Sequence, residues 1–254
     1  ILGPLIRSIF IPEKDHEWGI FDYSQQEPRL VVHYASLRHF TGAGKFVDSY
    51  QEDETTDFHT MVSEMADIPR KQAKTINLGL FYGMGKGKLM SQLGVNLETA
   101  SELLASYNER VPFVKQLMND TMNKAGKKGY LSTLEGRRCR FDQWEPTNEW
   151  GQKSLPLAEA QQQYGEHMIK RAWTYKALNR LIQGSAADQT KKAMLELDKE
   201  GYLAHIQVHD ELDFSVASDA DKNKIKEIME NCVELSVPSK VDVECGDNWG
   251  DAGD

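Results

Sequence analysis

The fold class that the sequence predicts is α+β, with strands near both ends of the chain and helices in the middle. Apolar, strand-like runs occur at residues 17–24, 203–216 and 240–246. Between them, apolar residues recur at helical spacing over long stretches, most regularly at residues 97–111. Strands that are separated by a block of helices are typical of α+β proteins rather than of alternating α/β folds.

Composition indicates a globular chain with enough residues for one large domain or two small ones. It has 254 residues, of which 40% are hydrophobic and 27% charged. No apolar run approaches the roughly 18 residues of a membrane span, and the start shows no basic leader or cleavage site. The three cysteines, Cys139, Cys232 and Cys245, include no CxxC pair, which argues against structural zinc and favours a reducing compartment. We therefore expect a cytoplasmic protein without a membrane partner.

Charge is distributed unevenly along the chain. The net charge is −9, which argues against nucleic-acid binding at first sight. Residues 70–140, however, hold 13 lysines and arginines against 5 aspartates and glutamates, a local net charge of +8. Because phosphate binding needs a local basic surface rather than a basic protein, this segment is a candidate site for nucleotides or nucleic acid.

Five segments can be assigned in the first part of the chain. They are a strand at 17–24, a helix at 28–40, a loop at 41–57, and helices at 58–65 and 70–82. The strand is apolar and ends in an acid, whereas the loop contains an acidic run typical of a solvated surface. The last helix begins after Pro69, which suits a first helical turn, and it ends at Gly83.

Seven further segments follow. They are helices at 97–111 and 113–125, a hairpin at 129–141, a helical stretch at 156–198, a second hairpin at 203–216, a helix at 221–235 and a strand at 240–246. Glu135 and Gly136 provide the turn of the first hairpin. Gly184 is an expected weak point of the helical stretch because glycine disfavours helix interiors.

Two aspartates lie next to apolar segments, where a carboxylate packs poorly. Asp22 ends the first apolar strand and Asp210 lies at the tip of the second hairpin. Each one alone is equally compatible with a turn or capping role. Two carboxylates that meet raise each other's pKa unless a cation lies between them, and Mg²⁺ suits such oxygens while keeping positions open for phosphates. The pair is therefore a candidate site for two-metal chemistry.

The helix expected at residues 70–82 is cationic at its start and apolar at its end. With about 100° between successive residues, Arg70, Lys74, Leu78 and Tyr82 form one drifting stripe about 20 Å long. The exposed N–H groups at the start of a helix also favour anions. A triphosphate fits the cationic end and a base and sugar fit the apolar end. The alternative is a solvated amphipathic helix with a basic start.

Three motifs resemble those of one enzyme family. DYSQQEPR at 22–29, RKQAKTINLGLFYG at 70–83 and QVHDE at 207–211 stand in the order of motifs A, B and C of family A DNA polymerases. The stretches LSTLEGRRCRF and NRLIQGSAAD and the tail VPSKVDVECGDNWGDAGD are similar to that family as well. The resemblance covers nearly the whole chain and points to the bacterial DNA polymerase I group and its phage relatives.

This resemblance implies an antiparallel palm sheet that carries the acids and an inserted, mainly helical fingers domain. The expected palm comprises residues 1–34, with motif A, and 166–254, with the second hairpin and the tail. The expected fingers comprise residues 35–165. The family's thumb and its 3′–5′ exonuclease-like domain are not visible in this sequence. Because the chain also lacks an initiator methionine, we expect the C-terminal palm and fingers portion of a longer polymerase.

The implied reaction is template-directed DNA synthesis, in which a primer 3′-hydroxyl attacks the α-phosphate of a dNTP and pyrophosphate leaves. The implied partners are primer–template DNA and dNTPs, and the implied cofactor is a pair of Mg²⁺ ions. By resemblance, Asp22 and Asp210 bind the metals, with the backbone carbonyl of Tyr23 as a further ligand. Glu211 would support catalysis nearby, and Lys74 would act on the triphosphate.

The resemblance also implies a set of nucleotide-binding residues. They are Glu27, His59, Arg70, Lys74, Leu78 and Tyr82. In the family, the residue at Glu27 crowds a ribose 2′-hydroxyl and selects deoxynucleotides, although Gln26 and Pro28 here replace the usual aliphatic neighbours. Leu78 stands where the family usually has Phe or Tyr, so apolar contact is kept but ring stacking is lost. His59 matches a histidine near the β- and γ-phosphates; a solvated surface histidine is the alternative.

Two groups of polar side chains are candidates for DNA contacts. Arg137, Arg138 and Arg140 follow the Gly turn and suit phosphate contacts, unless they are only a solvated hairpin tip. The second group is two pairs that each share one face of an element, Asn179 with Gln183 and Gln207 with His209. Uncharged amides can bond minor-groove acceptors that both base-pair types share, which suits an enzyme that accepts any sequence.

Two other interpretations stay open at this point. One is a single-subunit RNA polymerase, which shares a related palm and a Lys…Tyr-Gly helix; Glu27 and His209–Glu211 favour DNA instead. The other is a fragment without a thumb that binds nucleic acid but has little activity. In that case we expect weak, salt-sensitive DNA binding and low processivity.

Overall fold

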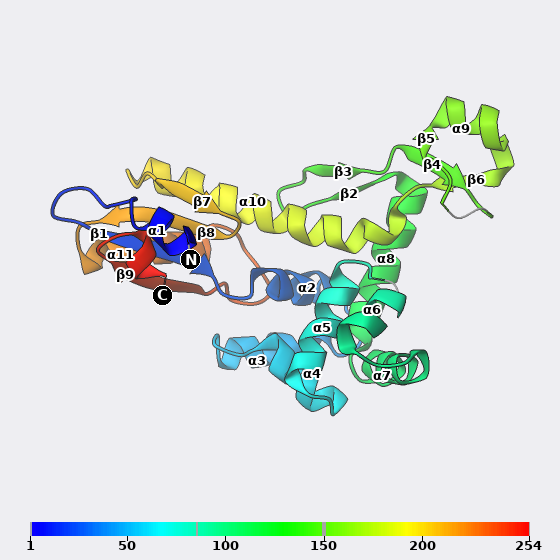
Figure 1. Ribbon diagram of the computed structural model, residues 1–254, viewed down its shortest axis with the longest axis horizontal. Helices are drawn as coiled ribbons and strands as arrows, with labels where there is room; N and C mark the ends of the chain where they lie inside the picture. The colour runs from blue at the N-terminus through cyan, green and yellow to red at the C-terminus, as the bar shows by residue number, and fades with distance from the viewer. Residues whose placement is uncertain (1, 85, 149–150, 254) are drawn as a thin grey trace. The chain divides into compact units, whose positions relative to one another are not determined.

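The computed structural model describes residues 2–84, 86–148 and 151–253 (Figure 1). The chain divides into two compact units. The first, called the sheet unit, comprises Ile1–His33, Val47–Thr56 and Ala186–Asp254. The second, called the helical unit, comprises Tyr34–Phe46 and Asp57–Ser185.

An antiparallel sheet of four strands, in the order β7-β8-β1-β9, is the centre of the sheet unit (Figure 1). Its strands are β1 (Glu17–Tyr23), β7 (Ile206–Val208), β8 (Glu211–Val216) and β9 (Val241–Gly246). β7 and β8 form a hairpin, and β1 lies between β8 and β9 and pairs with both. The middle of the sheet is thus built from the predicted motif A strand and the predicted second hairpin.

Both faces of β1 are buried along most of its length. Phe21 and Tyr23 lie in the larger core, which α10 (Ala177–Lys199) and α11 (Asp219–Asn231) help to build. Trp18 and Ile20 point to the other face, where they pack against Ala252 of α12 (Trp249–Ala252). This burial explains why the strand is a nearly continuous apolar run rather than an alternating one.

The helical unit contains five consecutive helices, α4 to α8. They are α4 (Phe58–Ala66), α5 (Arg70–Phe81), α6 (Lys86–Leu93), α7 (Leu97–Arg110) and α8 (Pro112–Lys128). Their core contains four fully buried phenylalanines, Phe46, Phe58, Phe81 and Phe113. The ring centroids of Phe46 and Phe113 lie 5.0 Å apart and those of Phe58 and Phe81 lie 5.9 Å apart, within the range of favourable aromatic pairs.

Short elements follow these helices in the helical unit. They are β2 (Tyr130–Ser132), β3 (Arg138–Arg140), β4 (Gln143–Pro146), β5 (Leu155–Pro156), α9 (Leu157–Tyr164), η1 (Glu166–Met168), β6 (Ile169–Arg171) and η2 (Thr174–Lys176). β2 and β3 form the predicted first hairpin, and β4 pairs with β5 and β6. Three more helices complete the chain: α1 (Leu2–Arg7), α2 (Gln26–Ser36) and α3 (Ala43–Glu52).

The mixture of helix and sheet is confirmed, but two segments were predicted wrongly. Residues 41–57 are not a loop, because α3 occupies Ala43–Glu52 and buries Phe46 and Tyr50 completely. The stretch at 156–198 is not one helix, because a short strand and two 3₁₀ turns separate α9 from α10. Gly184, by contrast, lies inside an unbroken α10.

The compact units differ from the predicted domain boundaries by one residue, at Tyr34, and more widely at two other places. Residues 47–56 belong to the sheet unit although they fall within the predicted fingers, and residues 166–185 belong to the helical unit although they fall within the predicted second palm segment. The names palm and fingers stay predictions. In the described part of the chain, we find no helix that is both long enough and apolar enough to cross a membrane.

Candidate active site

Asp22 lies on the central strand of the sheet with an acidic residue on each side. Its register partner on β8 is Glu211 and its partner on β9 is Asp242. Cross-strand partners in an antiparallel sheet lie about 4.5–5.5 Å apart at their Cβ atoms, so three carboxylates share one face near the end of β1. Glu211 is thus close to Asp22, as the sequence predicted.

Asp210 comes to the same end of the sheet through the turn between β7 and β8. Val208 pairs with Glu211, so His209 and Asp210 are the two turn residues, and His209 has a positive φ of 56°. The backbone N–H of Tyr23 donates a hydrogen bond to the backbone oxygen of Asp210 at 3.5 Å. The structure therefore places the predicted pair, Asp22 and Asp210, at adjacent positions within one unit.

The carboxyls at this end of the sheet differ in their electrostatics. Partial burial, followed by repulsion from Asp210, Glu211 and other acids, raises the pKa of Asp22 to about 7. Burial also raises the pKa of Asp210. Partial burial acts in the same direction on Asp242, but an ion pair and hydrogen bond with Lys240 outweigh it and lower the pKa of that carboxyl. Asp242 is therefore neutralised within the protein, whereas Asp22 is not.

The donor set at Asp22 and Asp210 fits a hard divalent cation. Within the described residues, Asp22 has no hydrogen-bond or ion-pair partner on its side chain, and burial followed by nearby acids raises its pKa, so its ionised form is left without a compensating cation. Carboxylate oxygens of this kind suit Mg²⁺. Among those residues, no group of three or more His, Cys, Asp or Glu side chains is arranged to hold a metal ion. The predicted set differs from such a group because its third member is the backbone carbonyl of Tyr23.

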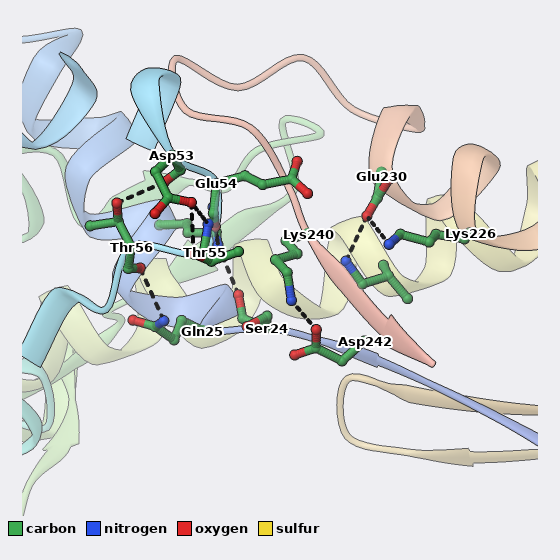
Figure 2. A network of polar contacts seen from close by, with 12 residues as sticks. Ser24, Gln25, Asp53, Glu54, Thr55, Thr56, Lys226, Glu230, Lys240 and Asp242 are labelled. Carbon is green, nitrogen blue, oxygen red and sulfur yellow. Dashed lines mark hydrogen bonds and ion pairs between the residues drawn. The ribbon is translucent and has the colours of Figure 1, made fainter. Parts of the chain in front are cut away.

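Polar contacts fix the chain just after Asp22 (Figure 2). The N–H of Ser24 donates to the oxygen of Lys240 at 2.8 Å. The side-chain amide of Gln25 donates to the oxygen of Thr56 at 3.2 Å, as Figure 2 shows. Thr56 is in turn held by the turn at Asp53, whose backbone oxygen accepts from the Thr56 hydroxyl at 2.6 Å. The end of motif A is thus attached to two segments that are distant in sequence.

Arg29 is a structural residue of this region that sequence reasoning missed. Its side chain is buried, and its guanidinium donates to the backbone oxygens of Ser24 at 2.8 Å, Pro238 at 2.7 Å and Glu54 at 2.6 Å. It also lies over the ring of Tyr50, 4.5 Å from the centroid. The guanidinium therefore joins three loops around the end of β1.

Helix α5 presents the predicted stripe to solvent. Arg70, Lys74 and Tyr82 are exposed and Leu78 is half-buried. The opposite side of the helix is buried through Ala73, Ile76, Asn77, Gly79 and Phe81. Gly83 has a φ of 65°, and a Cβ there would come within 2.6 Å of the backbone oxygen of Tyr175. The helix must therefore end at a glycine, as the sequence predicted.

Arg70 has a partner in this structure that the sequence did not reveal. Its Nε and Nη2 donate to the two carboxylate oxygens of Asp57 at 3.1 and 2.8 Å, and Nε also lies 3.1 Å from the hydroxyl of Thr60. Partial burial acts to raise the pKa of Asp57, but hydrogen bonds from Arg70 and Thr60 outweigh it and lower that pKa to about 2. The cationic start of α5 is thus fixed to the start of α4.

His59 is not a solvated surface histidine. It lies on the first turn of α4 with 7% of its surface exposed, and its Nδ1 is 2.8 Å from the side-chain nitrogen of Asn77. Burial first, and then the nearby charges of Lys74 and Arg70, lower its pKa, against an opposing effect of Asp57. Asn77 and its partner Tyr107 are two further residues that sequence reasoning missed.

The three arginines of the first hairpin differ in their contacts. Arg138 and Arg140 are two residues apart on β3 and exposed, and Arg138 lies over the Tyr130 ring, 4.6 Å from its centroid. Arg137 is also exposed but donates to the backbone oxygen of Gly184 at 2.8 Å. A Cβ on Gly184 would lie 2.8 Å from the side chain of Thr133, so this glycine is required for hairpin packing.

The remaining predicted DNA-contact residues are accessible to different degrees. Gln183 is exposed and Asn179 is half-buried on α10, within the helical unit. Gln207 and His209 are exposed in the sheet unit, and the Gln207 side chain donates to the backbone oxygen of His209 at 3.1 Å. The two aspartates predicted to bind metal and Glu27 belong to the sheet unit, whereas His59 and the α5 stripe belong to the helical unit.

The chain is similar to known proteins over nearly its whole length. The model of DNA polymerase family A matches residues 2–251. The chain belongs to DNA polymerase family A. A DNA-directed DNA polymerase of Pseudomonas phage M6 is 38% identical over 96% of this chain and 40% of its own length. DNA polymerase I of Bacillus subtilis (strain 168) is 33% identical over 98% of this chain and 28% of its own length.

A solved structure supports the family A fold. The POL domain of Pol1 from M. smegmatis, in complex with DNA primer-template and dNTP, matches with a TM-score of 0.77 and 29% identity. The match covers 99% of this chain and 43% of that one. The chain thus spans between about a quarter and two fifths of the length of the curated family A relatives described here.

Proposed function

We propose that this chain carries out template-directed DNA synthesis as the polymerase portion of a family A enzyme. In the proposed reaction, the 3′-hydroxyl of a primer attacks the α-phosphate of a dNTP, and pyrophosphate is released. The observation that carries the proposal is the adjacency of Asp22 and Asp210 at one end of the sheet, with the pKa of both carboxyls raised. Its partners are primer–template DNA and dNTPs.

In this proposal the sheet unit acts as the palm and the helical unit acts as the fingers. The palm role is supported by the antiparallel sheet that carries Asp22, Asp210 and Glu211. The fingers role is supported by α5, which exposes Arg70 and Lys74 at its start.

Asp22 and Asp210 are the proposed ligands of two Mg²⁺ ions, together with the backbone carbonyl of Tyr23. Bound Mg²⁺ would lower the pKa of the primer hydroxyl and stabilise charge on the phosphates. The side chain of Tyr23 is anchored away from this site, because its hydroxyl donates to the backbone oxygen of Met229 at 2.7 Å. This bond and the backbone pairing of β1 with β8 and β9 hold the proposed carbonyl ligand in place. Glu211, beside Asp22, contributes negative charge in a supporting role.

The nucleotide is proposed to bind along α5. Arg70 and Lys74 provide positive charge for the triphosphate, and His59 provides a hydrogen-bond donor for the β- and γ-phosphates. Leu78 and Tyr82 provide apolar surface for the sugar and base, with Tyr82 beside the templating position. In the sheet unit, Glu27 is proposed to exclude a ribose 2′-hydroxyl.

The duplex is proposed to be held without sequence selection. Exposed Arg138 and Arg140 are the proposed phosphate contacts, and Arg137 joins them while it also braces the hairpin. The proposed minor-groove contacts are Asn179, Gln183, Gln207 and His209. In the absence of further domains, DNA binding by this chain is expected to be weak and salt-sensitive and processivity to be low.

Primer extension tests the proposed function directly. Asp22→Ala and Asp210→Ala are each expected to abolish Mg²⁺-dependent extension with dNTPs. Asp198→Ala, which removes an exposed acid at the end of α10, is the control and is expected to leave extension unchanged. Near-normal extension by either site variant would refute the assignment. Extension with rNTPs in place of dNTPs would instead indicate an RNA polymerase.

A further inference from the structure

Three polar side chains form a buried chain of hydrogen bonds inside the helical unit. They come from three helices: His59 from α4, Asn77 from α5 and Tyr107 from α7. The hydroxyl of Tyr107 donates to Oδ1 of Asn77 at 2.5 Å, and Nδ2 of Asn77 lies 2.8 Å from Nδ1 of His59. Asn77 and Tyr107 are fully buried, and His59 is 7% exposed.

The direction of these hydrogen bonds follows from counting donors and acceptors. A tyrosine hydroxyl has one hydrogen to donate, and Tyr107 has no other side-chain partner within the described residues. If the Asn77 amide were reversed, its nitrogen would face Tyr107 and the buried hydroxyl hydrogen would have no acceptor. Because such an unpaired buried donor is costly, Oδ1 must face Tyr107, and Nδ2 must face His59.

This direction determines where the proton sits on His59. An amide nitrogen can only donate, so Nδ1 of His59 must accept and carries no hydrogen. The neutral ring then carries its hydrogen on Nε2, which has no hydrogen-bond partner among the described residues. A charged ring would need a hydrogen on Nδ1, which would oppose the Asn77 donor.

The surroundings of His59 favour the same neutral state. Burial, Lys74 and Arg70 all lower its pKa, and Asp57, which raises it, is already paired with Arg70. The ring can therefore offer one uncharged donor beside the two cations of α5. Asn77 is also on the buried side of α5, three residues after Lys74. The same helix therefore positions both the His59 ring, through Asn77, and the Lys74 cation.

We propose that Asn77 and Tyr107 are positioning residues that hold His59 as the neutral Nε2–H tautomer, ready to donate a hydrogen bond to a phosphate oxygen of the incoming nucleotide. The role of the donor rests on the proposed function. The role of the network in setting the tautomer does not, because it concerns the nucleotide-free protein.

The first test measures the tautomer without any reaction. The ring nitrogens of the seven histidines can be followed by ¹⁵N NMR against pH, and His59 is identified by the signal that is absent in His59→Gln. The wild type is expected to show the Nε2–H tautomer and a His59 pKa below that of a free histidine. In Asn77→Asp, which keeps the shape but makes both side-chain atoms acceptors, His59 is expected to gain a hydrogen on Nδ1 and to titrate at higher pH. An Nδ1–H ring in the wild type, or no change in Asn77→Asp, overturns the proposal.

The second test measures nucleotide use. Tyr107→Phe removes only the hydroxyl that donates to Asn77. It is expected to raise the KM for dNTP about 3- to 10-fold, with kcat within about twofold, as for loss of one hydrogen bond. Tyr164→Phe, which removes a hydrogen bond to the backbone of Lys153 elsewhere in the unit, is the matched control. Circular dichroism confirms that each variant is folded.

A double-mutant cycle separates positioning from simple packing. If Tyr107 acts through the His59 imidazole, Tyr107→Phe changes the KM for dNTP in the wild type but not in the His59→Gln background. An equal effect in both backgrounds overturns the positioning role. An Nε2–H ring in a protein that binds no dNTP would overturn the proposed function and the donor role together, whereas an Nδ1–H ring in an active enzyme would overturn the network alone.

Discussion

Arg70 and Asp57 form a two-point ion pair, with Nε and Nη2 of the guanidinium on the two carboxylate oxygens at 3.1 and 2.8 Å. Asp57 is also the N-cap of α4, since its side chain accepts a hydrogen bond from the N–H of Thr60. The Asp57 carboxylate therefore caps the start of α4 and also holds Arg70, the first cation of α5. A triphosphate that binds Arg70 must share the guanidinium with Asp57 or displace it.

Neutralising Asp57 is expected to strengthen nucleotide binding. Asp57→Asn keeps an oxygen for the helix cap but removes the negative charge that competes for Arg70. We expect the KM for dNTP to fall about 2- to 5-fold, as measured by steady-state primer extension. The matched control is Asp67→Asn at the C-cap of α4, where an exposed acid with a φ of 53° is replaced by a residue that accepts this conformation. A rise in KM for Asp57→Asn alone would show that the carboxylate positions Arg70 rather than competing for it.

Asp57 is also expected to contribute to acid sensitivity. Its pKa in the folded protein, about 2, is lower than the ordinary value of 3.8, so its stabilising effect is present above about pH 4. The effect is lost as the pH falls from about 4 to 2, and it amounts to about 1–2 kcal/mol after allowance for the exposed Arg70. Urea unfolding at pH 3 and pH 6 should therefore show a smaller difference for Asp57→Asn than for the wild type. Equal differences for the two proteins would contradict this contribution.

Divalent cations are expected to stabilise the protein through Asp22. Its pKa is raised to about 7, so the contribution of this carboxyl to stability is greatest at low pH and is lost as the pH rises toward 7. Mg²⁺ relieves the repulsion, so addition of Mg²⁺ should raise the Tm by about 2–4 °C at pH 8 and by less at pH 5.5. In Asp22→Asn the Mg²⁺ effect should be much smaller, whereas Asp198→Asn should behave like the wild type. Scanning calorimetry with Mg²⁺ or with EDTA measures this difference.

Glu27 is expected to control the choice of sugar. It lies half-buried in the first turn of α2, and in the proposed role its side chain excludes a ribose 2′-hydroxyl. Glu27→Ala should increase the rNTP-to-dNTP ratio of kcat/KM by at least about 10-fold, as loss of a steric block of this kind implies. Glu52→Ala, at the exposed end of α3, is the control. A ratio that does not change would refute the role of Glu27.

Leu78 is expected to weaken nucleotide contact relative to an aromatic residue. It is half-buried on the stripe proposed to bind the nucleotide, where a flat ring would add stacking area. Leu78→Phe should lower the KM for dNTP about 3- to 10-fold and change selection against dideoxynucleotides. Single-nucleotide incorporation with dNTP and ddNTP measures both. If neither changes, Leu78 serves only in helix packing.

The strands and the cationic helix could be predicted from sequence because their signals are local. β1 is apolar on both faces, and α5 begins after Pro69 and ends where only a glycine fits, at Gly83. Helix α3 was missed because it is mostly polar and its stability comes from burial of two aromatic side chains, Phe46 and Tyr50. Tertiary packing of this kind has no signal in the local composition.

The acidic and cationic residues of the candidate site could be predicted from the sequence, but the residues that hold them in position could not. Asp22 and Asp210 were found by motif, and the structure brings them to one end of the sheet. The contacts of Arg29 were not predictable because its partners are backbone oxygens, which every residue has. The partners of His59 were missed because Asn77 and Tyr107 carry no pattern that distinguishes them from ordinary helix residues. The predicted cytoplasmic location, the domain names and the role of each site residue stay predictions.

The contacts of Arg29 have a consequence for how the protein is made on the ribosome. Its guanidinium bonds the backbone of Pro238, and Ser24 bonds that of Lys240, although more than two hundred residues separate these partners in sequence. Motif A is translated more than two hundred residues before the segment that closes around it. A nascent chain therefore holds Asp22, the proposed metal ligand, in an incomplete setting until the segment with Pro238 and Lys240 has emerged. Translation that stops before residue 238 would yield a chain with every motif present and the first of them unsupported.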